Sequence, residues 1–142
     1  MEPRVTLITL GVDNLERAVR FYRDGLGWRP SSASVEGDVA FFQAGGLVLG
    51  LWSRANLAAD AHLEPDPGWG GVALARNLES REAVDSAVAS WVAAGGRVLK
   101  APVEADWGGY SGYVADPDGH PWELAWNPGW PLGPDGTVTL PD

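Results

Sequence analysis

The chain has 142 residues with a formal net charge of −9, because 19 acidic residues stand against 10 basic ones. This length suits one domain, and 45% hydrophobic residues supply enough apolar surface for a core. The acidic surface repels phosphate backbones and no Lys/Arg cluster offsets it, so we expect no nucleic-acid partner. With no cysteine, the chain forms no disulfide, thiolate metal site or cysteine nucleophile.

No apolar run approaches the roughly 20 residues that span a bilayer, and residues 1–5 lack the pattern of a signal peptide. Together with the absence of cysteine, this predicts a cytoplasmic protein with no membrane partner. The eight tryptophans are an unusual number. We expect most of them in the core, although their flat faces also suit a pocket for planar ligands.

The first half of the chain carries strand and helix signals. They are a strand at residues 4–12, a helix capped by Asp13 or Asn14 and ended by glycines at 25–27, and strands at 39–43 and 47–52 around a Gly45-Gly46 turn. Residues 53–68, rich in Ala, Asp and Pro, are predicted to form a linker.

The second half repeats this order. Its predicted elements are a strand at 71–76, a helix capped by Ser80 or Asn77 and ended by Gly95-Gly96, and strands at 97–101, 110–115 and 121–126. The sequence Asp-Pro-Asp-Gly at 116–119 predicts a turn in which aspartate caps backbone N–H groups and glycine takes positive φ. From Asn127 onward no regular structure is expected.

Both halves therefore follow the order β-α-β-β-β, which indicates an internal duplication. Residues 7–10 align with 71–74, and the hairpin segment 46–51 aligns with 119–124. The prediction is an α+β fold in one domain, residues 1–142. It consists of two paired modules, at 4–54 and 68–128, and a C-terminal tail at 129–142.

Two stretches resemble a known family: ITLGVDNLERAVRFYRDGLGW near the start, and GYVADPDGHPWELAWNP near the end. The chain looks like a member of the vicinal oxygen chelate superfamily, which includes glyoxalase I, extradiol dioxygenases and metal-free bleomycin-binding proteins. The resemblance runs from about residue 5 to residue 128. It implies two β-α-β-β-β modules forming a cupped mixed sheet around a cavity for a small molecule, and it favours a homodimer.

In the enzymes of this family, four strand positions hold a divalent metal that polarises the substrate. Those positions correspond here to Leu7, Gly50, Gly71 and Glu123. Leucine and glycine side chains carry no metal ligand, and one carboxylate is a weak site. We therefore expect no divalent metal and no other cofactor.

Glu123 has two interpretations. It can be a cavity carboxylate that binds a cationic or hydrogen-bond-donating ligand, or a catalytic general base. Alternatively, it pairs with a nearby arginine or water and has only a structural role. The two histidines do not complete a metal or nucleophile site, because His62 lies in the predicted linker and His120 at a hairpin end.

Further ligand-binding candidates share the strand alternation of these positions or lie in the loop before a strand. Gly50 and Gly71 leave free volume, which favours a bulky ligand or aromatic side chains packed inward. The complete predicted ligand-binding set is Leu7, Thr9, Gly50, Trp52, Gly71, Ala73, Trp107, Tyr110 and Glu123.

The favoured function is a metal-independent small-molecule-binding protein of the glyoxalase/bleomycin-resistance type, with a bulky and partly aromatic ligand. The alternative is a glyoxalase-like lyase or isomerase, or a dioxygenase. Such an enzyme would use Glu123 as acid/base or work with a divalent metal. The sequence leaves open which of the two it is and does not identify the ligand.

Overall fold

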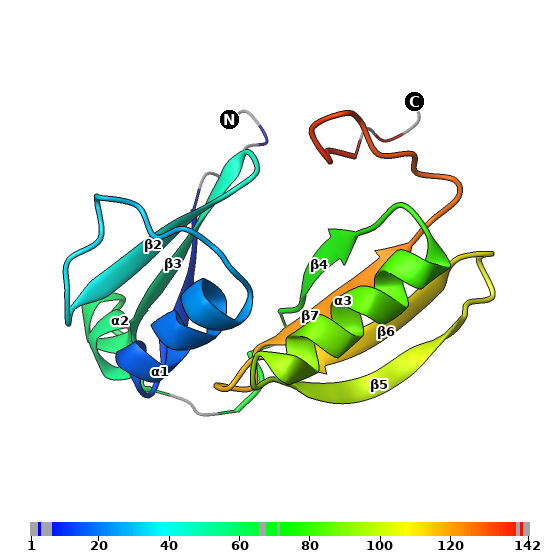
Figure 1. Ribbon diagram of the computed structural model, residues 1–142. Coiled ribbons are helices and arrows are strands. Elements are labelled where there is room, and N and C mark those ends of the chain that lie inside the picture. The colour runs from blue at the N-terminus through cyan, green and yellow to red at the C-terminus, as the bar shows by residue number, and fades with distance from the viewer. Residues whose placement is uncertain (1–2, 4–6, 66–67, 71, 139, 141–142) are drawn as a thin grey trace. The chain divides into compact units, whose positions relative to one another are not determined.

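The computed structural model describes residues 3, 7–65, 68–70, 72–138 and 140 (Figure 1). The chain divides into two compact units, Met1–Gly70 and Gly71–Asp142, here called the first and second units. Each unit contains its own mixed sheet. Among the described residues, no helix has the length and apolar character needed to cross a membrane.

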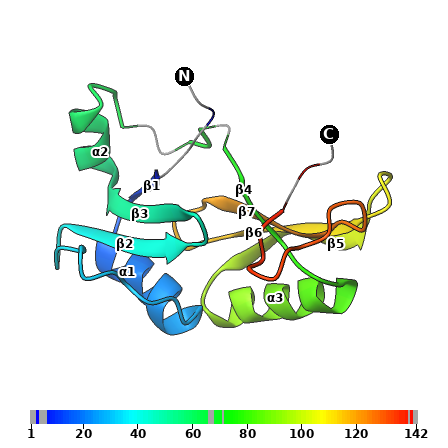
Figure 2. The same ribbon diagram turned by 90° about the horizontal axis from the view of Figure 1, so that it is seen from above.

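The first unit is a three-stranded sheet with one helical segment between its first and second strands and another helix after its last strand. Its elements are β1 (Leu7–Val12), α1 (Leu15–Arg20), the π-helix η1 (Phe21–Gly25), β2 (Val39–Ala44), β3 (Leu47–Ser53) and α2 (Arg54–Asp60). The strand order is β1-β3-β2, with β1 parallel and β2 antiparallel to β3. Figure 2 shows α1 on one side of this sheet and α2 on the other.

The core of the first unit lies between the sheet and the α1–η1 helix. Asn14 starts α1, because its side chain accepts a hydrogen bond from the Arg17 N–H at 2.9 Å, as one of the two predicted caps. Tyr22 and Phe42 are both fully buried, with ring centroids 6.0 Å apart. Alternate strand residues, including Val12 and Leu51, are buried on the same face.

The predicted β-α-β-β-β order requires a further strand between the first helix and β2, to which the sequence analysis assigned no residues, and only isolated bridges occur there in the described part of this unit. Pro30 bridges Phe42 and supplies no N–H for a longer ladder. The Phe41 carbonyl accepts from the Ser31 N–H at 2.8 Å. The Phe41 N–H, however, donates to the Ser34 hydroxyl at 2.9 Å, so a side chain takes the place of a strand partner. The first module therefore differs from the predicted β-α-β-β-β order.

Helix α2 corrects the prediction that residues 53–68 form a linker throughout. The Ser53 hydroxyl accepts from the Asn56 N–H at 3.4 Å at the start of the helix, and Ala58 is buried. The segment following Ser53 is rich in alanine, the residue with the strongest helix propensity.

The second unit is a four-stranded sheet covered on one face by a helix. Its elements are β4 (Leu74–Asn77), α3 (Arg81–Ala93), β5 (Arg97–Glu104), β6 (Tyr110–Ala115) and β7 (Pro121–Trp126). The order is β4-β7-β6-β5, with β4 parallel to β7 and the other pairs antiparallel. β5 continues past the predicted end at residue 101, because Pro102 is tolerated on an edge strand. β4 begins later than predicted, and Gly71 lies outside the described residues.

Helix α3 begins at the predicted cap, since the Ser80 hydroxyl accepts from the Ala83 N–H at 3.1 Å. Its buried Trp91 packs against Trp122 with ring centroids 5.5 Å apart. The Trp91 Nε1–H donates to the Ala115 carbonyl at 2.8 Å. These contacts place the even-numbered residues of β7 on the helix-covered face.

The Asp-Pro-Asp-Gly turn between β6 and β7 has the predicted structure. Asp116 is fully buried, and its Oδ1 accepts from the N–H groups of Asp118 at 3.0 Å and His120 at 2.9 Å. Gly119 has φ of +86°. The two mixed sheets and their helices confirm the predicted α+β class. Past β7, the described tail shows one bridge, Leu132 to Val138.

Candidate functional site

The predicted site residues belong mainly to the face of each sheet that points away from α1 or α3, here called the open face. On the first unit, the register pairs Thr9 with Gly50 and Gly50 with Phe41. Residues paired across a ladder share a face. The open face of the first unit therefore carries Leu7, Thr9, Gly11, Val39, Phe41, Gln43, Val48, Gly50 and Trp52.

Four predicted residues, Leu7, Thr9, Gly50 and Trp52, come together on this face. A Cβ added to Gly50 would lie 3.3 Å from Phe41 Cε1 and 3.3 Å from Thr9 Oγ1. The Phe41 ring and Thr9 thus occupy the space beside the glycine, as expected for an aromatic residue packed inward. Leu7 is 45% exposed at the start of β1, and the Trp52 Nε1–H donates to Asp38 Oδ1 at 3.4 Å.

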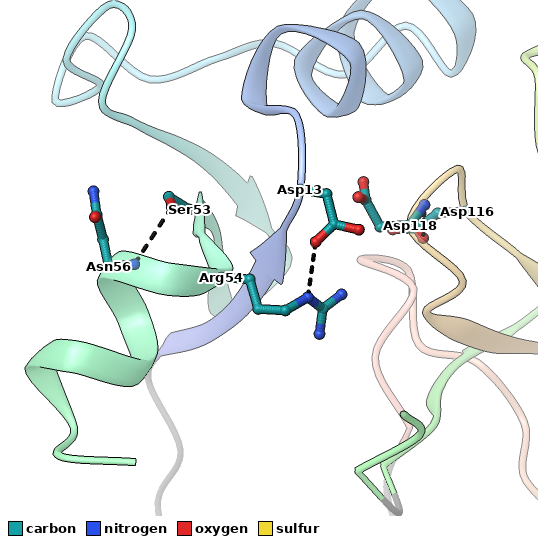
Figure 3. Close-up of polar contacts among 6 residues, drawn as sticks. All are labelled: Asp13, Ser53, Arg54, Asn56, Asp116 and Asp118. Atoms are coloured by element: carbon teal, nitrogen blue, oxygen red, sulfur yellow. Dashed lines mark hydrogen bonds and ion pairs between the residues drawn. The ribbon is translucent and has the colours of Figure 1, made fainter. Parts of the chain in front are cut away.

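An arginine missed by the sequence analysis lies at the end of this face. Arg54, the first residue of α2, packs on Gly11, where an added Cβ would be 3.2 Å from the Arg54 Cα. Its Nε–H donates to Asp13 Oδ1 at 3.0 Å (Figure 3). The Arg54 side chain is 19% exposed, whereas that of Asp13 is 63% exposed. The sequence feature that could have revealed Arg54 is Ser53, a helix-capping residue before an alanine-rich segment, which places Arg54 at the start of a helix.

On the second unit, Glu123 lies in the middle of a row that crosses the open face. The register pairs Glu123 with Ala75 of β4 on one side and with Tyr113 of β6 on the other. Tyr113 pairs in turn with Lys100 of β5. Glu123 and Tyr113 are both half-buried, and Lys100 is exposed.

Tyr113 and Lys100 are not among the residues predicted from the sequence, although for Tyr113 the turn that precedes β7 contains the information. The Asp116 N–H donates to the His120 carbonyl at 3.1 Å and closes the hairpin. Counting back from that pair places Tyr113 directly opposite Glu123. The position of Tyr113 opposite Glu123 was therefore predictable from the turn.

The sheet register also changes how the two halves of the repeat correspond. Thr9 is paired with Gly50, whereas Ala75 is paired with Glu123. If Gly50 and Glu123 are equivalent, the counterpart of Thr9 is Ala75, two residues beyond the aligned Ala73. Ala73 is exposed and precedes β4.

The two loop-side aromatic candidates lie elsewhere. Tyr110 is on the α3 side of the second sheet, where its hydroxyl donates to Asp85 Oδ1 at 2.9 Å. This hydrogen bond, with smaller contributions from desolvation and the negative charge of Asp85, raises the pKa of Tyr110 above its ordinary value. The Trp107 ring lies against Gly109 within its own loop and remains 53% exposed.

The side chains at the four family metal positions offer a single carboxylate. Leu7 and Gly50 lie on the open face of the first unit without a donor atom in their side chains, and Gly71 is again a glycine. The cross-strand neighbours of Glu123 are an alanine and a tyrosine. Within the described ranges, no three His, Cys, Asp or Glu side chains gather closely enough to hold a metal ion.

Comparisons with solved structures agree with this architecture. The chain is similar to a glyoxalase-related enzyme from Fulvimarina pelagi, with 42% identity, a TM-score of 0.88, and 96% and 97% of the two chains covered. It is similar to a glyoxalase/bleomycin resistance protein/dioxygenase from Nocardioides, with 26% identity, a TM-score of 0.74, and 94% and 91% covered. A lactoylglutathione lyase from Agrobacterium tumefaciens has 26% identity and a TM-score of 0.69, with 89% and 96% covered.

A search of curated proteins finds no match. A family model does match, over residues 4–124, which is most of the chain. The match begins before β1 and ends within β7, so it takes in most of both predicted modules. The chain therefore belongs to the Glyoxalase/Bleomycin resistance protein/Dioxygenase superfamily.

Proposed function

We propose that this chain is a metal-independent binding protein for a bulky, partly aromatic small molecule. The observation that carries the proposal is the donor set at the family's metal positions. Leu7, Gly50 and Gly71 have no ligating side chain, and Glu123 faces Ala75 and Tyr113 instead of further metal ligands. One carboxylate without imidazole or acidic neighbours does not fit a first-row divalent ion.

The open face of the first unit supports an apolar, aromatic ligand. Phe41 and Trp52 present ring surface there, and Leu7 and Val48 add aliphatic surface. Aromatic and aliphatic linings with a few polar groups are typical of small-molecule sites. In this proposal Thr9 supplies a hydrogen bond that orients a ligand on this face.

The same proposal includes a cytoplasmic homodimer. The family resemblance favours the dimer, and a chain without cysteine is compatible with a reducing compartment. Light scattering after size exclusion measures the mass directly. A mass equal to one 15.1 kDa chain at micromolar concentration would contradict the dimer.

A second candidate function is catalysis without a metal, as a lyase or isomerase with Glu123 as acid/base. The observation that favours it is the direct cross-strand pairing of Glu123 with Tyr113, which puts a phenol-bearing and a carboxylate-bearing residue side by side on one face. Such a pair can abstract a proton and stabilise the developing oxyanion. The solved structure with 42% identity is described as a glyoxalase-related enzyme.

Metal independence is tested by metal analysis of chelator-free protein and by thermal shift with nickel, zinc, manganese and ferrous ions. We expect no stoichiometric metal and no shift with any ion. The control is Leu7→His combined with Gly50→Glu, which adds an imidazole and a carboxylate to one face. A shift of several degrees in the unchanged protein would overturn the proposal.

Binding and catalysis are separated by Glu123→Gln. Tryptophan fluorescence is titrated with a set of cationic aromatic antibiotics, and each compound that binds is followed for conversion by mass spectrometry. A binding protein gives saturable quenching, weakened by the substitution, with no product. An enzyme gives a product that disappears in the variant. Glu36→Gln, an exposed glutamate in the first unit, is the charge control.

A further inference from the structure

We propose that the ligand carries an anionic group, a carboxylate, sulfonate or phosphate, and that Lys100 binds it. Lys100, Tyr113 and Glu123 then form one polar row across the open face of the second unit, here called the Lys100 row. The inference rests on the proposed small-molecule binding at Glu123 and extends it from one polar contact to two contacts of opposite charge.

The sheet register places the three residues of the Lys100 row in line. Lys100 of β5 pairs with Tyr113 of β6, and Tyr113 pairs with Glu123 of β7. Paired residues share a face, so all three side chains leave the sheet on the same side. Neighbouring strands are about 4.8 Å apart, so the Lys100 and Glu123 backbones are roughly 10 Å apart.

The backbone of β5 is shaped around Lys100. Register irregularities occur on both sides of it, between Val98 and Lys100 and between Lys100 and Val103. Such bulges redirect a side chain and are common next to binding sites. Gly112 of β6 permits the close approach, because an added Cβ would lie 2.8 Å from the Lys100 carbonyl oxygen and 2.8 Å from the Pro102 nitrogen.

Lys100 is one of the basic groups of this acidic chain that form no ion pair with a protein carboxylate within the described residues. It is the single lysine in the sequence. Arg23, Arg54 and Arg81 each bind a carboxylate of the protein. In the described part of the chain no carboxylate forms an ion pair with Lys100, and its cross-strand neighbour is the neutral Tyr113. Its ammonium group therefore has its charge available for an anion from solution.

The row specifies a class of ligand. The ammonium group at one end selects an anion, and the Glu123 carboxylate at the other end selects a cation or a hydrogen-bond donor. The Tyr113 ring between them offers a surface for an aromatic or apolar portion. The ligand is then amphoteric, with its two polar groups separated by an aromatic spacer.

A lysine on an edge strand also has a simpler role, because it discourages pairing with other strands. Two measurements on Lys100→Gln distinguish the roles. If the substitution causes self-association and leaves ligand preference unchanged, Lys100 only prevents β5 from pairing with strands of other molecules, and the inference is wrong. If ligand preference changes while the oligomeric mass stays the same, Lys100 binds the ligand.

The test uses two named probes, 4′-(aminomethyl)biphenyl-4-carboxylate and its methyl ester, with the full-length protein. We expect the acid to quench tryptophan fluorescence with an affinity on the order of 10-fold higher than the ester. Lys100→Gln should abolish this preference, and Arg29→Gln, which removes an exposed charge from the first unit, should retain it.

A second readout exploits the single lysine. Reductive methylation followed by mass spectrometry reports Lys100 and the chain's α-amino group only. The acid should protect Lys100 and the ester should not. Equal affinity for both probes with an unprotected lysine overturns the anion contact while leaving small-molecule binding intact. Loss of quenching by both probes and by the cationic aromatic compounds overturns the proposed function itself.

Discussion

Arg81 and Glu104 form two hydrogen bonds, from Nε to Oε1 at 2.7 Å and from Nη2 to Oε2 at 3.1 Å. They join the first residue of α3 to the last residue of β5. The Arg81 guanidinium also lies 4.5 Å from the ring centroid of Trp126, at the end of β7. One arginine thus contacts a central and an edge strand on the helix-covered face, opposite the Lys100 row.

This ion pair predicts a pH-dependent contribution to stability. The hydrogen bond from Arg81, together with its positive charge, lowers the pKa of Glu104 below its ordinary value. A folded-state pKa below the unfolded value stabilises the fold above the unfolded pKa, and this contribution is lost as pH falls through the folded value. Arg81→Gln should return the Glu104 pKa toward its ordinary value in an NMR titration.

The difference in unfolding free energy between the unchanged protein and Arg81→Gln should then shrink as pH falls below about 4. Arg23→Gln serves as the control, since Arg23 binds Asp24 and not Glu104. Identical Glu104 titration curves in the unchanged protein and Arg81→Gln would contradict the prediction.

The two tyrosines of β6 supply a matched test of which face binds the ligand. Tyr113 is paired with Glu123 on the open face, whereas the Tyr110 hydroxyl donates to Asp85 of α3. We expect Tyr113→Phe to weaken quenching by the aromatic probes by roughly 3- to 10-fold, the effect of one lost hydrogen bond. Tyr110→Phe should leave affinity unchanged and lower stability. The reverse pattern would place the ligand on the α3 side.

The buried hydrogen bond of Trp91 predicts a stability loss without a change in ligand affinity. Trp91→Phe removes the Nε1–H that donates to the carbonyl of the fully buried Ala115 at 2.8 Å. We expect a loss of about 1–3 kcal/mol in urea unfolding. Trp130→Phe, at a position 41% exposed, should change stability by less than about 0.5 kcal/mol. Equal losses in both variants would show that the hydrogen bond contributes nothing.

Gly112 is predicted to be required for the bulged shape of β5. In Gly112→Ala the new methyl group meets the Lys100 carbonyl and the Pro102 nitrogen, both backbone atoms that cannot rotate away. We expect destabilisation of about 1–3 kcal/mol, together with loss of the preference for the acidic probe. Gly46→Ala is the control, because nothing lies within 4 Å of its added Cβ. If the Gly112→Ala protein keeps its stability and its probe preference, Gly112 is not required for the position of Lys100.

Local signals in the sequence predicted local structure. The caps at Asn14 and Ser80 and the turn around Asp116 depend on side chains that bind backbone groups a few residues away, and they were found. The strand lost near Pro30 depends instead on Ser34, which binds the backbone of Phe41 seven residues later. No periodicity reveals such a contact, because one hydroxyl replaces a ladder hydrogen bond.

In the candidate site, too, local patterns in the sequence predicted some features, whereas features that depend on contacts between strands were not predicted. Alternation correctly grouped Leu7, Thr9, Gly50 and Trp52, since residues two apart on one strand share a face. Alternation also places Tyr110 and Tyr113 on opposite faces of β6, but only the register of the β6–β7 hairpin shows which of them shares a face with Glu123. The face on which Lys100 lies could not be predicted, because the bulges in β5 break the alternation from which the orientation of its side chain would be inferred.

The end of α2 shows why that helix was missed, and it supplies the last prediction. The Leu63 N–H donates to the Ala58 carbonyl at 2.8 Å, and the His62 N–H donates to the Ala59 carbonyl at 3.2 Å. This hydrogen-bond pattern usually places glycine where His62 stands, with φ of +56°. The customary glycine signal for a helix end is therefore absent from the sequence.

His62→Gly should stabilise the protein by about 0.5–1 kcal/mol, because glycine adopts positive φ without the steric cost that a side chain adds. Ala61→Gly is the matched control one residue earlier, where φ is −81°, and it should destabilise because glycine gains freedom in the unfolded chain. Urea unfolding of the two variants measures the difference. If His62→Gly is destabilising, the left-handed residue does not limit the stability of α2, and its imidazole makes contacts that outweigh the strain.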